Sequence, residues 1–325
     1  MKIFMLAPKE NWVVDRLVSE FNENNKDIIV STPEEADLIW LLAGWCWNHI
    51  SLDLLKKKKV IVTMWHAVPE RFTNHSLNDF AKRDQYVDLY HAPSLKSKKQ
   101  IEEIQNHLVA NPKPIKLILP WVNQELWFPI DKSSARKSLG IKEDRFVIGS
   151  FQRDTMGRNL TQPKLEKGPD LFCNIVENIV EHTDRDVEVL LGAWRRQYVI
   201  SRLESKGIKY TFNEMPREKT LNVMYNALDL YIVASRYEGG PQSVVECAAS
   251  KTPIVSTDVG IASSILAPHS IFGDECIKDE FIYEHDILDT VRSDVEYAYD
   301  KVSKLFMPES FDSFRSIIET IGGVN

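Results

Sequence analysis

Short apolar runs separated by longer amphipathic stretches form the pattern of this chain from its first residues. Compact runs rich in β-branched and aromatic residues, bounded by polar or turn residues, are typical of strands covered on both faces. In the first part of the chain these runs are residues 2–7, 27–32, 36–42, 60–65, 87–92 and 115–120. The first amphipathic helical segment covers residues 12–24. Strands that alternate with helical segments predict βαβ units and a parallel sheet.

The pattern breaks after residue 120 and then begins again. Residues 121–142 contain no strand pattern, include Pro129, and carry a short helical segment at residues 133–139. The second series of strand-like runs covers residues 145–151, 186–193, 208–212, 228–235 and 252–258. We therefore expect an α/β fold of two doubly wound domains.

Four segments describe the expected domain organisation. They are an N-terminal Rossmann-like domain at residues 1–125, a linker at 126–143, a C-terminal Rossmann-like domain at 144–307, and a helix at 308–325 that packs back toward the first domain. Doubly wound sheets bind their ligands at the carboxyl ends of the strands, which is where functional residues are expected.

Composition narrows the functional classes. The 325 residues are 43% hydrophobic and 27% charged, with a net charge of −7, which is ordinary for a globular protein. Residues 1–130 carry 16 basic and 16 acidic residues, so the acidic excess lies in the remainder. This balance excludes the strongly basic footprint of a nucleic-acid-binding protein.

Cysteine spacing and hydropathy indicate the cellular compartment in which the protein is expected. The four cysteines are widely separated and form no C-x-x-C pair, so the chain favours a reducing compartment over a disulfide framework. The first residues contain too few apolar positions for a signal peptide, and no apolar run approaches the ~18 residues of a membrane span. We expect a cytoplasmic protein, with peripheral membrane contact left open.

The segment after the strand-like run 228–235 carries the most chemical information. Residues 238–241 (EGGP) form a turn, and a helix is expected from Gln242 to Ser250. Glycines at a strand-to-helix junction let the backbone approach a ligand, and a helix N-terminus favours anions. Glu246 lies on the same helix face as Gln242 and can accept paired hydroxyls. These residues predict an anionic, hydroxyl-rich ligand, although two glutamates eight residues apart also occur on solvated surfaces.

Residues 238–260, EGGPQSVVECAASKTPIVSTDVG, resemble the E-x7-E signature of the retaining glycosyltransferases of family four. Residues 211–235 and 118–141 resemble the family's preceding elements and its interdomain passage, so the resemblance covers roughly residues 118–266. It implies the GT-B fold, in which two Rossmann-like domains face each other across a cleft. It also implies a hexosyltransferase that moves a sugar from a UDP- or GDP-linked donor to the hydroxyl of a glycan or lipid-linked glycan.

The same resemblance assigns roles to residues. Glu238 would lie near the transferred sugar in a catalytic role, and Glu246 would hold the ribose hydroxyls of the nucleotide. The donor-binding residues implied are Arg153, Lys167, Gly239, Gly240, Gln242, Ser243 and Glu246. The donor would bind mainly to the second domain and the acceptor mainly to the first.

Phosphate neutralisation is expected to need no metal or other cofactor. The family uses an arginine and a lysine from the loop after the first strand of the second domain, which points to Arg153 and Lys167. The insertion TMGRNLTQPKLE makes Arg158 and Lys164 alternatives to them. Asp184 and Asp186 form a D-x-D, but their place between a helix and a strand is typical of turn residues.

The first domain offers weaker signals. His66, at the end of the run 60–65, matches the position of a catalytic histidine in the family, with His91 and Ser94 as a second candidate pair. The tryptophans of this half are Trp12, Trp40, Trp45, Trp47, Trp65, Trp121 and Trp127. They suit either sugar stacking or a core. The run 56–59 (KKKK) suits a solvated helix end or contact with anionic lipid.

Two other functions stay open. A nucleotide-sugar epimerase on the same fold would change the donor without an acceptor. A non-catalytic nucleotide-sugar-binding protein would bind the donor without turnover.

Overall fold

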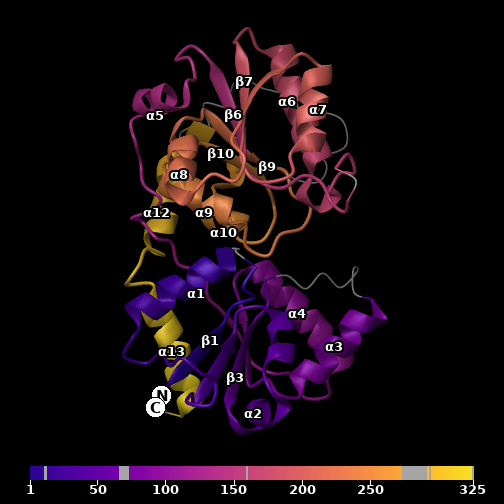
Figure 1. Ribbon diagram of the computed structural model, residues 1–325, viewed down its shortest axis with the longest axis vertical. Helices are drawn as coiled ribbons and strands as arrows, with labels where there is room; N and C mark the ends of the chain where they lie inside the picture. Colours follow the sequence, from indigo (N-terminus) through magenta and orange to yellow (C-terminus); the bar gives the residue numbers. More distant parts are fainter. Residues whose placement is uncertain (11–12, 66–72, 159, 273–290, 293, 324–325) are drawn as a thin grey trace. The chain divides into compact units, whose positions relative to one another are not determined.

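The computed structural model shows two compact α/β units, formed by residues 1–121 with 307–325 and by residues 122–306 (Figure 1). The structure describes residues 1–10, 13–65, 73–158, 160–272, 291–292 and 294–323. Each unit contains one parallel sheet with helices packed against it. The predicted α/β class with two parallel-sheet domains is confirmed.

Among the residues that the structure describes, the sheet of the first unit has five strands that pair in chain order. They are β1 (Ile3–Leu6), β2 (Leu38–Leu41), β3 (Lys59–Thr63), β4 (Leu89–Ala92) and β5 (Ile115–Leu117). The run 27–32, predicted as a strand, forms only a parallel bridge between Ile29 and Ile3. Pro33 follows this run closely, and because proline has no N–H to donate it does not extend a ladder.

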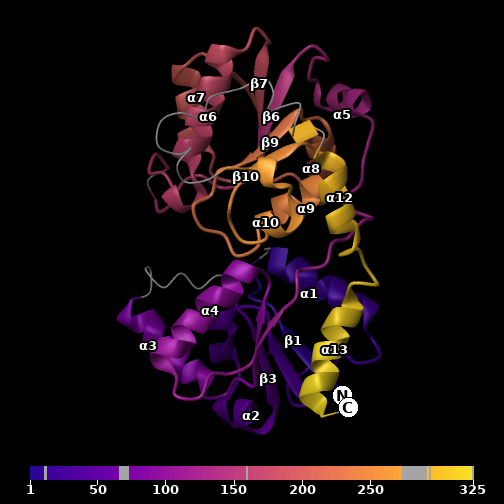
Figure 2. The ribbon, with the colours of Figure 1, turned by 180° about the vertical axis from the view of Figure 1, so that it is seen from behind.

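Helices cover both faces of this sheet. The helix α1 (Val13–Asn24) and the terminal helix α13 (Phe311–Gly322) share one core with the sheet, as Figure 2 shows from behind. The opposite core contains residues from η1 (Gly44–His49), α2 (Leu52–Lys57), α3 (Asn74–Asp84) and α4 (Leu95–Leu108). In the first core Trp121 packs edge-on against Phe314 at a centroid distance of 4.9 Å. Contacts between these large rings hold α13 against residues 1–121 of the unit, which lie far from it in the sequence.

In the described residues, the sheet of the second unit has six parallel strands in the order β11-β10-β9-β6-β7-β8. They are β6 (Phe146–Ser150), β7 (Val187–Leu191), β8 (Lys209–Phe212), β9 (Leu230–Val233), β10 (Ile254–Thr257) and β11 (Ile271–Phe272). The order reverses between β6 and β9, which makes the carboxyl ends of these two strands the topological switch point.

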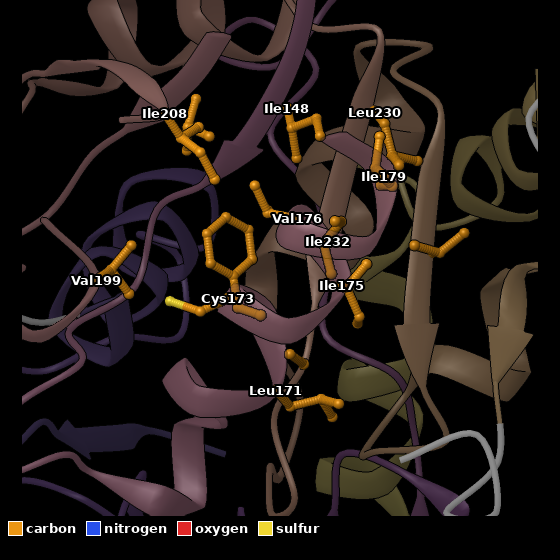
Figure 3. Close-up of a cluster of buried hydrophobic side chains, with 14 of the residues drawn as sticks. Ile148, Leu171, Cys173, Ile175, Val176, Ile179, Val199, Ile208, Leu230 and Ile232 are labelled. Carbon is orange, nitrogen blue, oxygen red and sulfur yellow. The ribbon is translucent and has the colours of Figure 1, made fainter. Parts of the chain in front are cut away.

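Helices also flank the second sheet. They are α5 (Lys132–Leu139), α6 (Pro169–His182), α7 (Gln197–Ser205), α8 (Glu218–Asn226), α9 (Gln242–Ala249), α10 (Ala262–Ile265) and α12 (Val295–Ser303), with the short turns η3 (Leu165–Lys167) and η4 (Pro268–Ser270). Figure 3 shows the core in which α6 and α7 pack against the sheet. Residues 126–143, expected as a linker, belong to this unit. There Arg136 of α5 forms a buried ion pair with Asp229 at 2.5 Å.

Candidate functional site

Two loops are joined at the switch point of the second unit, one after β9 and one before α6. Arg236 forms a two-point ion pair with Asp170, with nitrogen–oxygen distances of 2.9 and 2.8 Å. The backbone N–H groups of Arg236 and Tyr237 both donate to the carbonyl of Glu166. A paired arginine and shared carbonyl hold both loops in one geometry.

Gly168 permits this close approach. Its φ is +59°, in the left-handed region, and a Cβ built there would lie 1.8 Å from the carbonyl oxygen of Ala234. Only glycine fits a position that combines this dihedral with direct backbone contact. Gly168 therefore places Lys167 beside the carboxyl end of β9.

Lys167 and Glu238 form the centre of the site. The Lys167 Nζ lies 2.5 Å from Glu238 Oε1. The same carboxylate oxygen accepts a hydrogen bond from Ser235 Oγ at 3.0 Å. Gln152, which follows β6, donates to the Lys167 carbonyl at 2.8 Å. The structure thus brings together residues from three loops that are far apart in the sequence.

Two further cations belong to this cluster. Burial lowers the pKa of Lys164, and the charges of Arg153 and Lys167 lower it further, while Glu238 opposes them. Lys164 is therefore close enough to Arg153, Lys167 and Glu238 for electrostatic interaction with each of them. Positive side chains that repel one another across a half-buried site are stabilised by a bound anion. Of the two alternatives from the insertion, Lys164 is half-buried within reach of these charges, whereas Arg158 is exposed.

A buried ion pair holds the loop that carries Arg153. Arg196 is fully buried and donates to the carbonyls of Ser150 and Gly192, at 2.5 and 3.1 Å. Its Nε lies 3.2 Å from Asp154 Oδ2. Burial raises the pKa of Asp154 and lowers that of Arg196, and the charge of each partner opposes the other's shift. This network ties the carboxyl ends of β6 and β7 to the residue that follows Arg153.

The glycine turn lies directly after this cluster. Gly239 is buried, Gly240 is half-buried, and α9 begins at Gln242 with Pro241 as its N-cap residue. Gly260, with φ +51°, packs against the turn so closely that a Cβ there would lie 2.7 Å from Pro241 Cδ. The backbone of the turn is therefore held by the start of α9 and by its contact with Gly260.

The expected ribose ligand, Glu246, lies on α9 and is buried. Its Oε2 accepts a hydrogen bond from the Tyr225 hydroxyl at 2.9 Å. Ser243, one turn earlier, is hydrogen-bonded to the hydroxyl of Tyr231. A buried carboxylate costs free energy unless it is hydrogen-bonded, so this phenol is part of what keeps Glu246 in place.

The histidine candidates of the first unit have different outcomes. His66 lies outside the described residues. His91 is buried, with Nδ1 at 3.0 Å from Thr63 Oγ1 and Nε2 at 2.9 Å from the Ile118 carbonyl. Burial lowers its pKa to about 4, so the ring is neutral. His91 is a core histidine, and Ser94 caps the N-terminus of α4 rather than presenting a reactive group.

Among the described tryptophans of the first half, the exposure of Trp45 differs from the rest. Trp40, Trp47, Trp65, Trp121 and Trp127 are buried, whereas Trp45 is 42% exposed. Trp45 lies in η1, just beyond the carboxyl end of β2. Trp12 lies outside the described residues.

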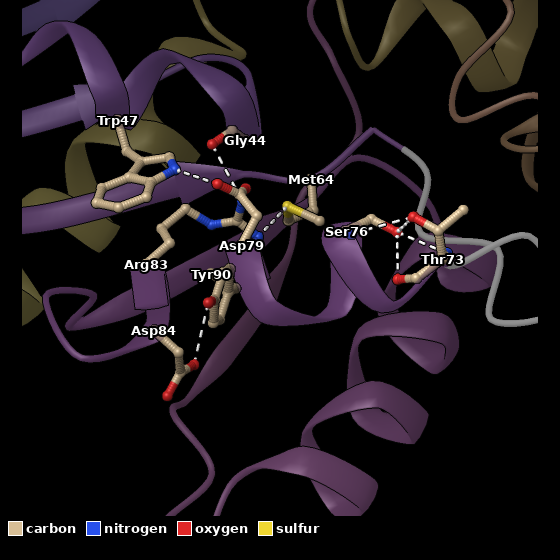
Figure 4. A network of polar contacts seen from close by, with 9 residues as sticks. All are labelled: Gly44, Trp47, Met64, Thr73, Ser76, Asp79, Arg83, Asp84 and Tyr90. Carbon is tan, nitrogen blue, oxygen red and sulfur yellow. Dashed lines mark hydrogen bonds and ion pairs between the residues drawn. The ribbon is translucent and has the colours of Figure 1, made fainter. Parts of the chain in front are cut away.

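A polar network beneath η1 holds this turn (Figure 4). The Arg83 guanidinium donates to the Gly44 carbonyl at 3.1 Å, and Trp47 Nε1 donates to Asp79 at 3.0 Å. A Cβ on Gly44 would meet Met64 Sδ at 2.9 Å. These contacts hold the turn in place, although it carries an exposed indole.

The remaining sequence signals have ordinary structural roles. Lys58 and Lys59, in the run 56–59, contact the Glu34 carbonyl and Asp88. Asp186 forms an ion pair with Arg145 at 2.9 Å. In the part of the chain that the structure describes, no three His, Cys, Asp or Glu side chains gather into a metal-binding group. None of the described helices combines the length and apolar character needed to cross a bilayer.

Most of the predicted donor-site residues occupy one edge of the second sheet. The sequence did not single out Tyr225, Ser235 or Gln152, each of which bonds a predicted residue or its backbone. Tyr225 lies three residues before the start of the run 228–235. Nothing in the local pattern separates it from a core tyrosine.

Comparison with known proteins agrees with this geometry. Residues 156–277 match the family model described as "Glycosyl transferases group 1". The lipopolysaccharide core biosynthesis mannosyltransferase LpsB of Rhizobium meliloti is 25% identical over 144 residues, which are 42% of this chain and 38% of that protein. The D-inositol 3-phosphate glycosyltransferase of Corynebacterium diphtheriae is 28% identical over 189 residues, which are 54% of this chain and 42% of that protein. The chain thus spans about two fifths of the length of these relatives.

Among solved structures, Anabaena HepE in complex with UDP and glucose superposes with a TM-score of 0.69 at 16% identity, covering 99% of each chain. A likeness at this identity concerns the fold. It confirms the expected fold class, the two Rossmann-like domains of GT-B glycosyltransferases.

Proposed function

We propose that this protein is a glycosyltransferase that binds a nucleotide-sugar donor on its second unit and transfers the sugar to an acceptor hydroxyl. The observation that carries the proposal is the Lys167–Glu238 ion pair at the topological switch point, with Lys164 near enough for the charges of both, and of Arg153, to act on it. The family match over residues 156–277 covers two of these cations and Glu238.

The cluster suits the charge changes of such a transfer. When the bond between the sugar and the diphosphate breaks, negative charge grows on the leaving oxygen. Fixed cations stabilise that charge, and the loss of a single comparable donor typically costs about 3 kcal/mol in the barrier. Lys167 is held by the loop contacts described above, so it needs little reorganisation during the reaction.

We further propose a retaining, metal-independent reaction, as in family four. The sugar–phosphate bond breaks and the new glycosidic bond forms on the same face of the ring, while the acceptor proton passes to the departing diphosphate. The protein then supplies position and electrostatic stabilisation. Glu238 would accept hydrogen bonds from hydroxyls of the transferred sugar, and Glu246 would accept hydrogen bonds from those of the ribose. A UDP-linked donor is supported by the likeness to HepE, whose structure contains UDP and glucose.

The acceptor is proposed to bind to the first unit, as a glycan or lipid-linked glycan. The exposed indole of Trp45 supports this, because it lies at the carboxyl edge of the sheet on a turn held by Arg83. An apolar ring face suits the C–H face of a sugar ring. A catalytic role for His66 and a cytoplasmic location, with peripheral membrane contact, belong to the same proposal.

The test begins with thermal shift against UDP-glucose, UDP-galactose, UDP-N-acetylglucosamine and GDP-mannose. A ligand that binds only the folded state raises the unfolding temperature, and at a fixed concentration the shift is larger the tighter the ligand binds. The donor that binds is then incubated with candidate glycan acceptors, and the products are analysed by mass spectrometry. Lys167→Ala and Glu246→Ala should each lower the thermal shift, whereas Arg158→Ala, at an exposed position, should not.

The outcomes separate the candidate functions. Glycosylated product formed in the presence of a chelator supports the proposal, and activity that returns only with a divalent metal contradicts its metal-independent part. An epimerised sugar without acceptor identifies an epimerase. Donor binding without turnover across the panel identifies a binding protein, and the absence of any nucleotide binding would falsify the donor assignment.

A further inference from the structure

Tyr225 is the least expected neighbour of the donor site. It lies near the end of α8 and is almost completely buried. Aromatic rings surround it, with Phe151, Tyr231 and Trp127 at centroid distances of 5.0, 5.4 and 6.0 Å. A tyrosine hydroxyl in such surroundings needs a hydrogen-bond partner, and here the partner is the Glu246 carboxylate at 2.9 Å.

The direction of this hydrogen bond is determined by the two groups. Burial raises the pKa of Tyr225 well above its ordinary value of 10.0, and the charge of Glu246 raises it further. The phenol therefore keeps its proton at all working pH values and always donates. Glu246 accepts through Oε2, and a carboxylate has about four lone-pair positions in total. The bond from Tyr225 therefore occupies only one of these positions.

The helix that carries Tyr225 is itself bonded to the helix that carries Glu246. Ser250, which ends α9, donates to Asn222 Oδ1 of α8 at 2.9 Å. Thr252 Oγ1 donates to the Tyr225 carbonyl at 3.0 Å. These contacts hold the two helices at one separation, so the phenol and the carboxylate meet in a single geometry.

We propose that Tyr225 is a positioning residue, which holds the Glu246 carboxylate in the orientation that accepts the ribose hydroxyls of a nucleoside diphosphate. This rests on the proposed function and deepens it. The ligand class is a ribonucleoside diphosphate or its sugar ester, and Tyr225 acts on it only through Glu246. A pair that only stabilised the core would require no charge, because an apolar pair of the same volume is at least as stable in a dry interior.

The decisive experiment compares ribose with a ribose that lacks its hydroxyls. Affinities of UDP, GDP and their 2′,3′-dideoxy forms are measured by calorimetry for the wild-type protein and for Tyr225→Phe. We expect Tyr225→Phe to weaken binding of the preferred ribonucleotide about tenfold, the effect of one hydrogen bond to a charged group. Affinity for the dideoxy form should change less than about twofold. With the matching nucleotide sugar, the donor KM should rise while kcat stays near the wild-type value.

Tyr231→Phe is the matched control. Tyr231 is buried in the same aromatic cluster, and its hydroxyl accepts the Phe151 N–H at 3.1 Å and is bonded to Ser243 rather than to Glu246, so it does not act on the proposed ribose ligand. This variant should lower the unfolding temperature without changing the ratio of ribo to dideoxy affinities. A purely structural role for Tyr225 predicts the same behaviour for Tyr225→Phe, and that result overturns the inference.

Two precautions keep the test decisive. If Tyr225→Phe does not fold, Glu246→Ala is compared with Glu246→Ala/Tyr225→Phe, in which the buried charge and the acceptor of the Tyr225 hydrogen bond are both absent. The two should discriminate between ribo and dideoxy forms equally, and a further loss in the double variant contradicts the inference. If the wild-type protein binds no nucleotide, the proposed function fails. If it binds and Tyr225→Phe keeps the wild-type ratio, only the role of Tyr225 fails.

Discussion

Polar residues near the carboxyl ends of the strands have different surroundings in the two units. In the second unit, Lys167 and Glu238 meet in a half-buried ion pair, with Lys164 close enough to interact with both. In the first unit, His91 bonds Thr63 and a backbone carbonyl inside the core. Positions near strand ends thus hold a charged pair in the second unit and, at His91, an internal neutral contact in the first. The difference teaches that strand-end position alone does not identify a functional residue.

The largest effect on stability is expected from Gly168→Ala, which disrupts the backbone contact beside Lys167 in the second unit. A left-handed dihedral and a Cβ 1.8 Å from the Ala234 carbonyl oxygen should together destabilise the second unit by about 3–5 kcal/mol. Gly140→Ala is the matched control, because Gly140 has φ +70° with nothing within 4 Å of its Cβ. It should cost only about 1 kcal/mol. Urea unfolding measures both, and equal losses would show that backbone contact at Gly168 is unimportant.

The neutral His91 contact in the core of the first unit should be lost in acid. His91 has a folded pKa of about 4 against an ordinary value of 6.5, so the folded state resists protonation. Its contribution is fully present above pH 6.5 and is lost as the pH falls toward 4. The total loss is up to about 3 kcal/mol.

Unfolding at pH 7 and pH 4.5 measures this effect. His91→Gln should lose less stability between the two pH values than the wild-type protein. His182→Gln, at an exposed helix end, should behave as the wild-type protein does. A His91 variant with an unchanged acid loss would rule out this histidine as its source.

A smaller effect tests whether the charged edge depends on Lys164. Burial and the charges of Arg153 and Lys167 lower its pKa from 10.5, so it loses its proton at a lower pH than an ordinary lysine. Nucleoside diphosphate affinity should therefore weaken as the pH rises through the lowered value. Lys164→Met should cost about tenfold at neutral pH, and Lys164→Arg should remove the alkaline weakening. Calorimetry with UDP and GDP from pH 7 to pH 10 measures both, and wild-type affinity in Lys164→Met would exclude the residue from the site.

The smallest effect concerns the exposed indole of the first unit. Trp45→Ala should raise the acceptor KM about three- to tenfold, the range of an aromatic stacking contact, with donor affinity unchanged. Tyr297→Ala removes a similarly exposed ring, 45% accessible, from α12 of the second unit and should leave the acceptor KM unchanged. Steady-state kinetics with varied acceptor measure this. An unchanged acceptor KM in Trp45→Ala would remove the support for an acceptor site there.

Much of the fold could be predicted because local patterns determine it. The runs 228–235 and 252–258 became β9 and β10, and the turn at 238–241 leads into α9 as expected. The run 27–32 did not become a full strand, and β11, only two residues long, was not foreseen. Such short edge pairings depend on neighbouring strands more than on their own residues.

The site could be predicted only in part. By itself, the sequence determined which residues follow a strand, where glycine permits a turn, and which side chains carry charge, because each is a local property of the chain. The tertiary structure alone decided that Lys164 lies within reach of the charges of Arg153, Lys167 and Glu238, that His91 is internal, and that Tyr225 meets Glu246. These outcomes depend on the packing of elements far apart in the sequence, and burial and hydrogen-bond geometry exist only once those elements are packed.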